Sequence, residues 1–278
     1  MILVSGTSGA LGGLIHDRLA AIEGVNVVAG SRTGGRTGAR LIDFDEPDTL
    51  SEGFDGVDVL VFVSAGFAED DVVIARHGNV VDAAAKAGVR HVIYTSLAGS
   101  GDRLTISVAH RWTEARLAAA PFDVTILRNG LYGEIPAGMA LSAIESGVFA
   151  APWGDGRLPV VARADLADIA ARVAVESSAH LGRTYELEGV ETVGGQDVAD
   201  VLTEALGRPV RYRTTSLSDT RKALESFLEL YAVGHTVSTS SNIAAGLLEP
   251  REGDLTSLLT APPRSVRDLI ANVVVSGV

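Results

Sequence analysis

Three glycines near the amino terminus constrain the fold of this chain more than any other feature. Gly6, Gly9 and Gly12 follow a short apolar segment and open an amphipathic stretch of helical length. In a strand–loop–helix unit such glycines allow a tight turn, close approach of a diphosphate to the backbone, and close packing of helix on strand. N–H groups at the helix start then attract phosphate. We therefore predict a Rossmann-type dinucleotide site that includes Gly6, Thr7, Ser8, Gly9, Ala10, Leu11 and Gly12.

Apolar β-branched runs alternate with helical periodicity up to about residue 130, which predicts βαβ units and a parallel sheet. The expected strands are 2–4, 25–29, 40–44, 57–63, 91–95 and 123–128, and the expected helices are 10–22, 70–87 and 108–119. Later expected elements are helices 136–147, 163–177 and 196–206, strands 183–188 and 209–214, and a mostly helical tail from residue 217.

The predicted fold class is α/β, with a doubly wound parallel sheet and a smaller, mainly helical C-terminal substrate lobe. The nucleotide-binding domain is expected over residues 1–130 and the substrate lobe over 131–278. The two share a core in this prediction, or form one structural domain. Such a lobe commonly shapes the substrate cleft beside the nucleotide half.

Cofactor choice is expected to depend on the end of the second strand. An arginine there attracts the 2′-phosphate of NADP(H), whereas a carboxylate would bind the free ribose hydroxyl of NAD(H). The sequence places Arg32 at this point, which favours NADP(H), with NAD(H) as the alternative; a solvated loop residue is the simpler interpretation of Arg32. Ends of later strands complete the predicted cofactor wall with Asp43, Phe44, Val63, Ser64, Ala65 and Gly66.

Composition excludes several classes of function. The formal net charge of -12 argues against a duplex nucleic acid partner, which needs a basic patch. The chain has no cysteine, and its six histidines show no ligand spacing, so no metal site is expected. No apolar run is long enough to span a bilayer and no signal peptide is apparent, so we expect a cytoplasmic protein without membrane contact. A homodimer is one assembly that the sequence allows.

One absence bears on the chemistry. Many dinucleotide-dependent dehydrogenases donate a proton through a Tyr-x-x-x-Lys pair on a helix. No tyrosine here is followed by a lysine at that spacing, so ordinary ketone reduction by this relay is not expected. His110 lies on the helix that would carry the pair, and we take it as the candidate catalytic residue, protonating or hydrogen bonding a substrate oxygen near neutral pH. A structural role is the alternative for this histidine.

Several segments together resemble the NmrA-like family of atypical short-chain dehydrogenases, and most closely its NAD(P)H:quinone oxidoreductase type 2 members. The resemblance covers most of residues 1 to about 215 and is weak beyond Leu217. It implies that Arg32 and the glycine loop hold NADPH, and that residues 129–134 border the nicotinamide and the substrate. A lysine frequent in the quinone reductases is Ala115 here, which puts the acceptor in doubt. The segments are 79–84, 94–98, 110–114, 127–132, 147–149, 163–165 and 185–189.

A small aromatic or quinone substrate follows from these arguments. A quinone accepts hydride readily and yields a stabilised phenolate, so positioning supplies most of the catalysis. Tyr132 and Trp153 are expected to stack on a planar ring or to be packing residues. The alternatives are a non-catalytic redox sensor, and an aromatic polyketide tailoring enzyme that couples reduction to hydroxylation. The predicted substrate-binding residues are Thr95, Ser96, Asn129, Gly130, Tyr132 and Trp153.

Overall fold

The computed structural model describes residues 1–33, 36–65 and 68–276, with side chains described up to residue 272. The chain folds into two compact, interleaved units. The first unit comprises residues 1–97, 108–129 and 164–185, and the second comprises 98–107, 130–163 and 186–278. The predicted domain boundary near residue 130 stays a prediction.

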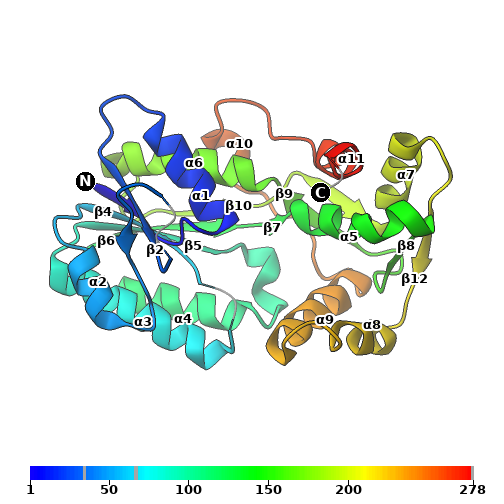
Figure 1. Cartoon of the computed structure of the whole chain (residues 1–278), viewed down its shortest axis with the longest axis horizontal. Helices are drawn as coiled ribbons and strands as arrows, with labels where there is room; N and C mark the ends of the chain where they lie inside the picture. The colour runs from blue at the N-terminus through cyan, green and yellow to red at the C-terminus, as the bar shows by residue number, and fades with distance from the viewer. Residues whose placement is uncertain (34–35, 66–67, 277–278) are drawn as a thin grey trace. The chain divides into compact units, whose positions relative to one another are not determined.

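A seven-stranded sheet organises the first unit (Figure 1). Its strand order is β10-β6-β5-β4-β1-β2-β3, and the pairs from β6 through to β3 are parallel. This order reverses at β1, as in doubly wound folds that bind ligands at the reversal point. The strands are β1 Ile2–Val4, β2 Val27–Ser31, β3 Arg40–Leu41, β4 Val59–Val63, β5 His91–Leu97, β6 Asp123–Asn129 and β10 Thr184–Leu187.

Helices cover both faces of this sheet (Figure 1). Helices α1 (Ala10–Ala20) and α6 (Arg163–Val175) lie on one face, and α2 (Pro47–Gly53), α3 (Asp70–Ala87) and α4 (Ser107–Ala118) lie on the other. Buried residues of the sheet pack with α2–α4 in one apolar core. The predicted α/β fold class is confirmed.

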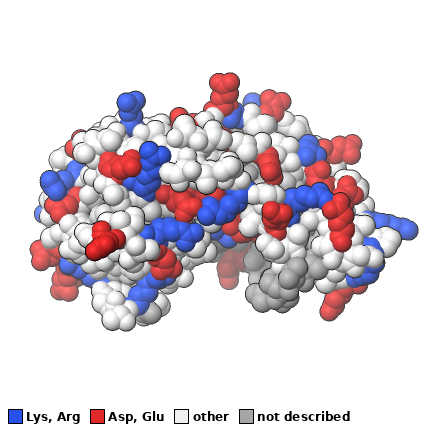
Figure 2. Space-filling view, turned by 90° about the horizontal axis from the view of Figure 1, so that it is seen from above, with Lys and Arg blue, Asp and Glu red and all other residues white. Residues whose placement is uncertain are grey.

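Charged side chains join helices on the outer surface of this layer. Arg18 of α1 donates to the Asp168 carboxylate of α6 at 2.7 Å. Figure 2 shows Lys and Arg interspersed with Asp and Glu over the face that these helices cover. Exposed pairs of this kind contribute about 0–1 kcal/mol each, so the apolar core dominates the stability of the layer.

The second unit has two small sheets and most of the C-terminal helices. Its sheets have the strand orders β11-β9-β7 and β12-β8. The sequence prediction missed most of these strands because each is only two to five residues long. The strands are β7 Leu131–Tyr132, β8 Val148–Ala151, β9 Arg157–Val161, β11 Glu191–Gly194 and β12 Arg211–Thr214. The helices are α5 Glu134–Ser146, α7 Gly195–Leu206, α8 Leu217–Leu224, α9 Leu230–Ala244, α10 Leu255–Leu258 and α11 Val266–Ser276, and 3₁₀ turns elsewhere cover Gly99–Arg103 and Ser177–Ala179.

None of the helices in residues 1–33, 36–65 and 68–276 combines the length and the apolar character that a membrane span needs.

Candidate functional site

The glycine loop after β1 has the backbone geometry that a diphosphate site requires. Gly6 has φ +65°, a left-handed conformation that side chains disfavour. A Cβ on Gly12 would lie 2.4 Å from the Gly6 carbonyl oxygen and 2.9 Å from that of Ser5. Both neighbours are backbone and cannot swing aside, so only glycine allows α1 to pack this closely against the loop. The roles predicted for Gly6 and Gly12 therefore have a steric basis.

The start of α1 leaves its amides available to a ligand. Gly9 is the N-cap, no side chain caps the helix, and its first turn holds no acidic residue. Ser8, Gly9 and Ala10 are exposed, whereas Leu11 is buried beneath the helix. Thr7 fixes the loop to β2, since its N–H and its hydroxyl both donate to the Gly30 carbonyl, at 3.1 and 3.2 Å. Unshielded N–H groups at a helix start form a site that fits a diphosphate.

Three arginines follow β2, and the structure separates their roles. Arg36 hydrogen bonds to Asp17 and to the His16 ring, and Arg40 donates to the carbonyls of Gly53 and Asp55 at 2.8 and 2.6 Å. Arg32 is exposed directly after β2, and it forms no ion pair with any residue that the structure describes. Arg32 is therefore the arginine that remains available for a 2′-phosphate.

A carboxylate moderates the charge beside Arg32. Arg76 of α3 binds Asp45 through two hydrogen bonds of 2.8 and 2.7 Å. The hydrogen bonds from Arg76, together with its charge and the charge of Arg32, lower the pKa of Asp45. Asp45 is therefore ionised at neutral pH and belongs to a group with two guanidinium ions and one carboxylate.

The residues predicted after β3 do not extend that strand. Asp43 Oδ1 accepts the Asp45 N–H at 3.0 Å, and this turn takes the chain out of the sheet after Leu41. Phe44 is 8% exposed and packs edge-to-face on Phe62 with ring centroids 5.6 Å apart. Cofactor contact by Asp43 and Phe44 stays a prediction, and Phe44 also has a clear packing role.

The end of β4 is tied to its neighbours through backbone amides. Val63 donates its N–H to the Ser5 hydroxyl at 3.0 Å, and Ser64 donates to the Thr95 hydroxyl at 3.1 Å. The Ala65 N–H donates to His77 Nε2 at 3.2 Å. These bonds hold the predicted cofactor wall at the carboxyl edge of the sheet. Gly66, also predicted for this wall, lies outside the described residues.

His110 lies in a buried polar network behind that edge. Its Nδ1 lies 2.9 Å from the Tyr94 hydroxyl, and burial lowers the pKa of His110 to about 4. The imidazole is thus neutral at neutral pH, where the sequence argument allowed it to titrate. Burial also raises the pKa of Tyr94, which stays a neutral phenol. The catalytic role of His110 stays a prediction. A neutral imidazole can hydrogen bond to a substrate oxygen, but it is a poor acid for protonating that oxygen.

A second histidine in this network was missed by sequence reasoning. His77 is fully buried, and burial lowers its pKa to about 3. Because Nε2 accepts the Ala65 N–H, the ring proton resides on Nδ1, which donates to the Thr113 hydroxyl at 2.7 Å. Thr113 in turn donates to the Ala109 carbonyl at 2.7 Å. No local pattern joins His77 to Thr113, because they lie on different helices.

Glu114 is the centre of a second cluster, which includes the predicted substrate residue Ser96. The Ser96 hydroxyl donates to Glu114 Oε1 at 2.5 Å, and Arg128 donates to both carboxylate oxygens at 3.0 and 2.6 Å. Arg111 donates to Glu114 Oε1 at 2.8 Å and to the Leu97 carbonyl at 2.9 Å. The cluster holds the ends of β5 and β6 to α4. Ser96 therefore has a structural role in this cluster, and its contact with a substrate stays a prediction.

Replacing Glu114 by glutamine should destabilise the protein. The carboxylate is only 13% exposed, so losing its charge leaves two partly buried guanidinium groups poorly paired. We expect the free energy of unfolding to fall by about 1–3 kcal/mol. Urea denaturation at pH 7 measures this. Glu225→Gln, in the exposed pair with Arg221, is the matched control and should change stability by under about 0.5 kcal/mol; equal effects of the two variants would contradict the prediction.

The remaining predicted substrate residues belong to both units. Asn129 ends β6 and is 4% exposed, and its Oδ1 accepts no hydrogen bond from any described residue. Gly130 donates its N–H to the Leu187 carbonyl at 3.0 Å. The Arg163 guanidinium carbon lies 4.6 Å from the centroid of the Tyr132 ring and stacks over it. Trp153 is 2% exposed and lies in the core of the second unit. The geometry of Trp153 fits the packing alternative given for it above.

The sheet order and the loop define a Rossmann-type protein of the dinucleotide-binding class. The NmrA-like family model matches residues 1–253, and the chain belongs to this family. The predicted family is thus confirmed.

Individual relatives agree with that family assignment. Quinone oxidoreductase 2 of Escherichia coli (strain K12) is 33% identical, over 81% of this chain and 82% of its own length. A crystal structure of the NADPH-dependent quinone oxidoreductase of Escherichia coli with NADPH has TM-score 0.89 and 29% identity, covering 98% of this chain and 99% of that one. Triphenylmethane reductase of Citrobacter sp. with NADP(H) has TM-score 0.88 and 27% identity over the same shares.

Proposed function

We propose that this chain is an NAD(P)H-dependent oxidoreductase that reduces a quinone or a similar planar conjugated carbonyl, with NADPH as its cofactor. The glycine loop carries the proposal, because Gly12 is in steric contact with Gly6 and the amides of α1 are unshielded. Family membership supports it. So do relatives that are named as reductases of quinones and triphenylmethane dyes.

The chain's own residues divide the work of binding. The amides at the start of α1 bind the diphosphate, and Arg32 pairs with the 2′-phosphate. The backbone at Ser64 and Ala65, held by Thr95 and His77, borders the ribose and nicotinamide. When bound, NADPH supplies the hydride. Neutral Tyr94 and His110 keep the network behind this wall free of charge at neutral pH.

A quinone suits this site because Tyr94 and His110, in the described network behind the cofactor wall, are both neutral at pH 7. Its reduced oxygen is a stabilised phenolate, so orientation provides most of the acceleration. Asn129 and Thr95 are the proposed polar contacts to the substrate, because a side-chain amide N–H and a hydroxyl can each donate a hydrogen bond to a quinone oxygen. Residue 115 is alanine here, where the quinone reductases often have a lysine. We therefore expect the preferred hydride acceptor to differ from that of the quinone reductases.

Steady-state assays with NADPH and a panel of benzo-, naphtho- and anthraquinones test the proposal. We expect quinone-dependent loss of absorbance at 340 nm with multiple turnovers. Binding of NADPH without turnover of any quinone would overturn the reductase and favour a redox sensor. Oxygen uptake with gain of one oxygen atom in the product would instead indicate a hydroxylating enzyme.

Replacing Arg32 by alanine should weaken NADPH binding selectively. A charge-assisted contact to the 2′-phosphate contributes about 1.5–3 kcal/mol, so Kd for NADPH should rise roughly 10- to 100-fold. Affinity for NADH should stay within about twofold, because NADH lacks that phosphate. Fluorescence titration of both cofactors measures the ratio. Arg36→Ala is the control, since Arg36 is engaged with Asp17; a larger effect there than at Arg32 would contradict the assignment.

A further inference from the structure

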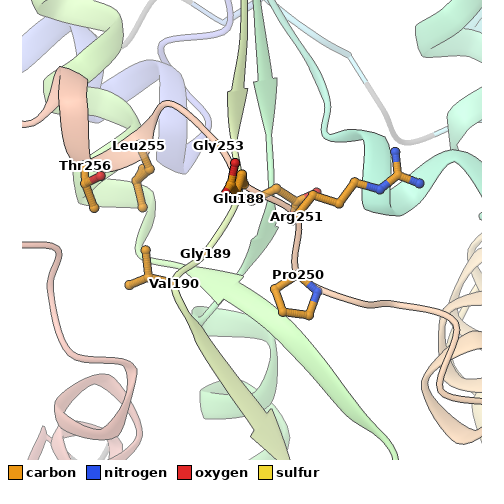
Figure 3. A pocket seen from close by; sticks show the side chains of 9 residues that line it. Glu188, Gly189, Val190, Pro250, Arg251, Gly253, Leu255 and Thr256 are labelled. Carbon is orange, nitrogen blue, oxygen red and sulfur yellow. The ribbon is translucent and has the colours of Figure 1, made fainter.

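A pocket in the second unit carries charges of both signs (Figure 3). It has a volume of about 440 Å³ and is lined by residues of the segments 188–190 and 250–256. Glu188 and Glu252 contribute carboxylates, whereas Arg251 contributes a guanidinium. Burial raises the pKa of Glu188, and the positive charge of Arg251 opposes that effect. The lining therefore favours neither a cation nor an anion.

A buried histidine of the first unit supports the predicted cofactor wall from behind. The Ala65 N–H, just beyond β4, donates to Nε2 of His77 in α3 at 3.2 Å. The preceding amide, that of Ser64, donates instead to Thr95 in β5, within the sheet. Ser64 and Ala65 are partly exposed, whereas His77 is fully buried. A ligand can therefore reach the backbone at Ala65, and His77 can act on that ligand only through Ala65.

Backbone groups at both ends fix the donor and acceptor roles around His77. The Ala65 N–H can only donate, so Nε2 carries no proton and Nδ1 carries one. The Ala109 carbonyl can only accept, so the Thr113 hydroxyl donates to it at 2.7 Å and accepts from His77 Nδ1 at 2.7 Å. Both ends thus require the same tautomer. Because α3 and α4 lie side by side (Figure 1), this chain of hydrogen bonds links the Ala65 amide to α4.

The ring of His77 has little freedom to move. Phe62 and Tyr94 pack edge-to-face against it, with ring centroids 4.9 and 5.8 Å away. Burial lowers the pKa of His77 to about 3, so the ring is neutral at neutral pH and keeps this tautomer. Removing the partner of either ring nitrogen leaves a buried N–H unsatisfied, which is unfavourable. The ring or the backbone at Ala65 must then shift.

We propose that His77 and Thr113 are positioning residues that set the affinity for the nicotinamide half of the cofactor through the Ala65 amide. This inference rests on the proposed function, because it requires NADPH to lie along residues 64 and 65. In that proposal Arg32 and the start of α1 bind the adenosine half and the diphosphate. A disturbance at His77 should therefore weaken binding of the nicotinamide half and spare the adenosine half.

Binding of NADPH and of 2′,5′-ADP, which lacks the nicotinamide half, separates these two effects. His77→Asn can still donate to Thr113 but is too short to reach the Ala65 N–H. We expect its Kd for NADPH to rise about tenfold and its Kd for 2′,5′-ADP to stay within about twofold. His77→Gln places an amide oxygen near the position of Nε2 and can accept the Ala65 N–H. It should bind NADPH within about threefold of the wild-type Kd, a rescue that a merely structural histidine would not show.

A second pair of variants tests the same chain of hydrogen bonds from α4. Thr113→Val keeps the shape of the side chain but removes the acceptor for His77 Nδ1, whereas Thr113→Ser keeps the hydroxyl. We expect the valine variant to lose roughly fivefold in NADPH affinity without losing affinity for 2′,5′-ADP. The serine variant should bind both compounds like the wild-type chain.

His91→Asn is the matched control for the loss of a buried histidine. His91 is 3% exposed and lies at the amino end of β5, away from the edge that holds Ser64. This variant should lower the thermal stability but leave the ratio of the two Kd values unchanged. If the wild-type chain binds NADPH and the ratio is also unchanged in His77→Asn and Thr113→Val, the inference is wrong.

Nitrogen NMR of the histidine rings tests the tautomer without any cofactor. His77 should show a protonated Nδ1 and an unprotonated Nε2. The opposite tautomer would overturn the inference even if NADPH binds. Failure of the wild-type chain to bind NADPH would instead overturn the proposed function, and the inference with it.

Discussion

Gly12→Ala should abolish most of the affinity for NADPH. The added methyl group would lie 2.4 Å from the Gly6 carbonyl oxygen and 2.8 Å from its carbon, so α1 must move away from the loop. Overpacking of this kind costs about 1–3 kcal/mol, and the moved amides no longer converge on the diphosphate. We expect Kd for NADPH to rise at least roughly 100-fold, with a lower free energy of unfolding.

Fluorescence titration with NADPH and urea denaturation measure the two effects together. Gly138→Ala is a matched control, because it lies within α5 and a Cβ there meets no atom within 4 Å. That substitution should stabilise the helix by about 0.5–1 kcal/mol and leave NADPH binding unchanged. Wild-type cofactor affinity in Gly12→Ala would exclude the loop as the diphosphate site.

Mild acid should destabilise the protein strongly. Burial lowers the pKa of His77 to about 3 and those of His91 and His110 to about 4. The unfolded chain binds these protons near pH 6.5, whereas the folded chain does not. Stability is therefore fully present above pH 6.5 and falls as the pH decreases toward 4. Three such groups remove on the order of 4–6 kcal/mol between pH 6.5 and pH 5.

Urea denaturation across this pH range measures how steeply the free energy of unfolding changes with pH. Glu188 acts in the opposite direction, because its raised pKa favours the folded state as the pH falls, and it offsets part of the loss. His91→Gln is the informative variant: His91 Nε2 lies 2.8 Å from the Thr125 hydroxyl, and a glutamine amide can replace that donor without titrating. Because the variant removes one of the three histidines, its free energy of unfolding should depend on pH about one third less steeply. An unchanged slope would show that His91 is not protonated on unfolding.

Local sequence patterns predicted the framework of the first unit well. The helix expected over 70–87 is α3, Asp70–Ala87, and it ends at Gly88, which has φ +72°. The glycine loop and the six strands up to β6 were also expected, because glycine spacing and β-branched runs are local signals. The short helix α2 was missed, since its seven residues offer too little periodicity.

Long-range polar contacts account for what the sequence did not predict. His77 meets Thr113 across 36 residues, and Glu186 and Glu188 meet Gly99 and Ser100 across 87 and 88 residues. Such pairings depend on the fold and leave no spacing in the sequence. The neutral state of His110 was unpredictable for the same reason, because it results from burial, and burial of a single histidine is set by packing.

The interleaving of the two units limits how this protein can be cut or recombined. The chain passes between the units five times, at residues 97–98, 107–108, 129–130, 163–164 and 185–186. A fragment ending at residue 130 would lack the edge strand β10 and helix α6, leaving the free edge of β6 open to self-association. Grafting a new substrate specificity onto this scaffold therefore calls for replacing loops in place, because neither half can be exchanged as a contiguous cassette.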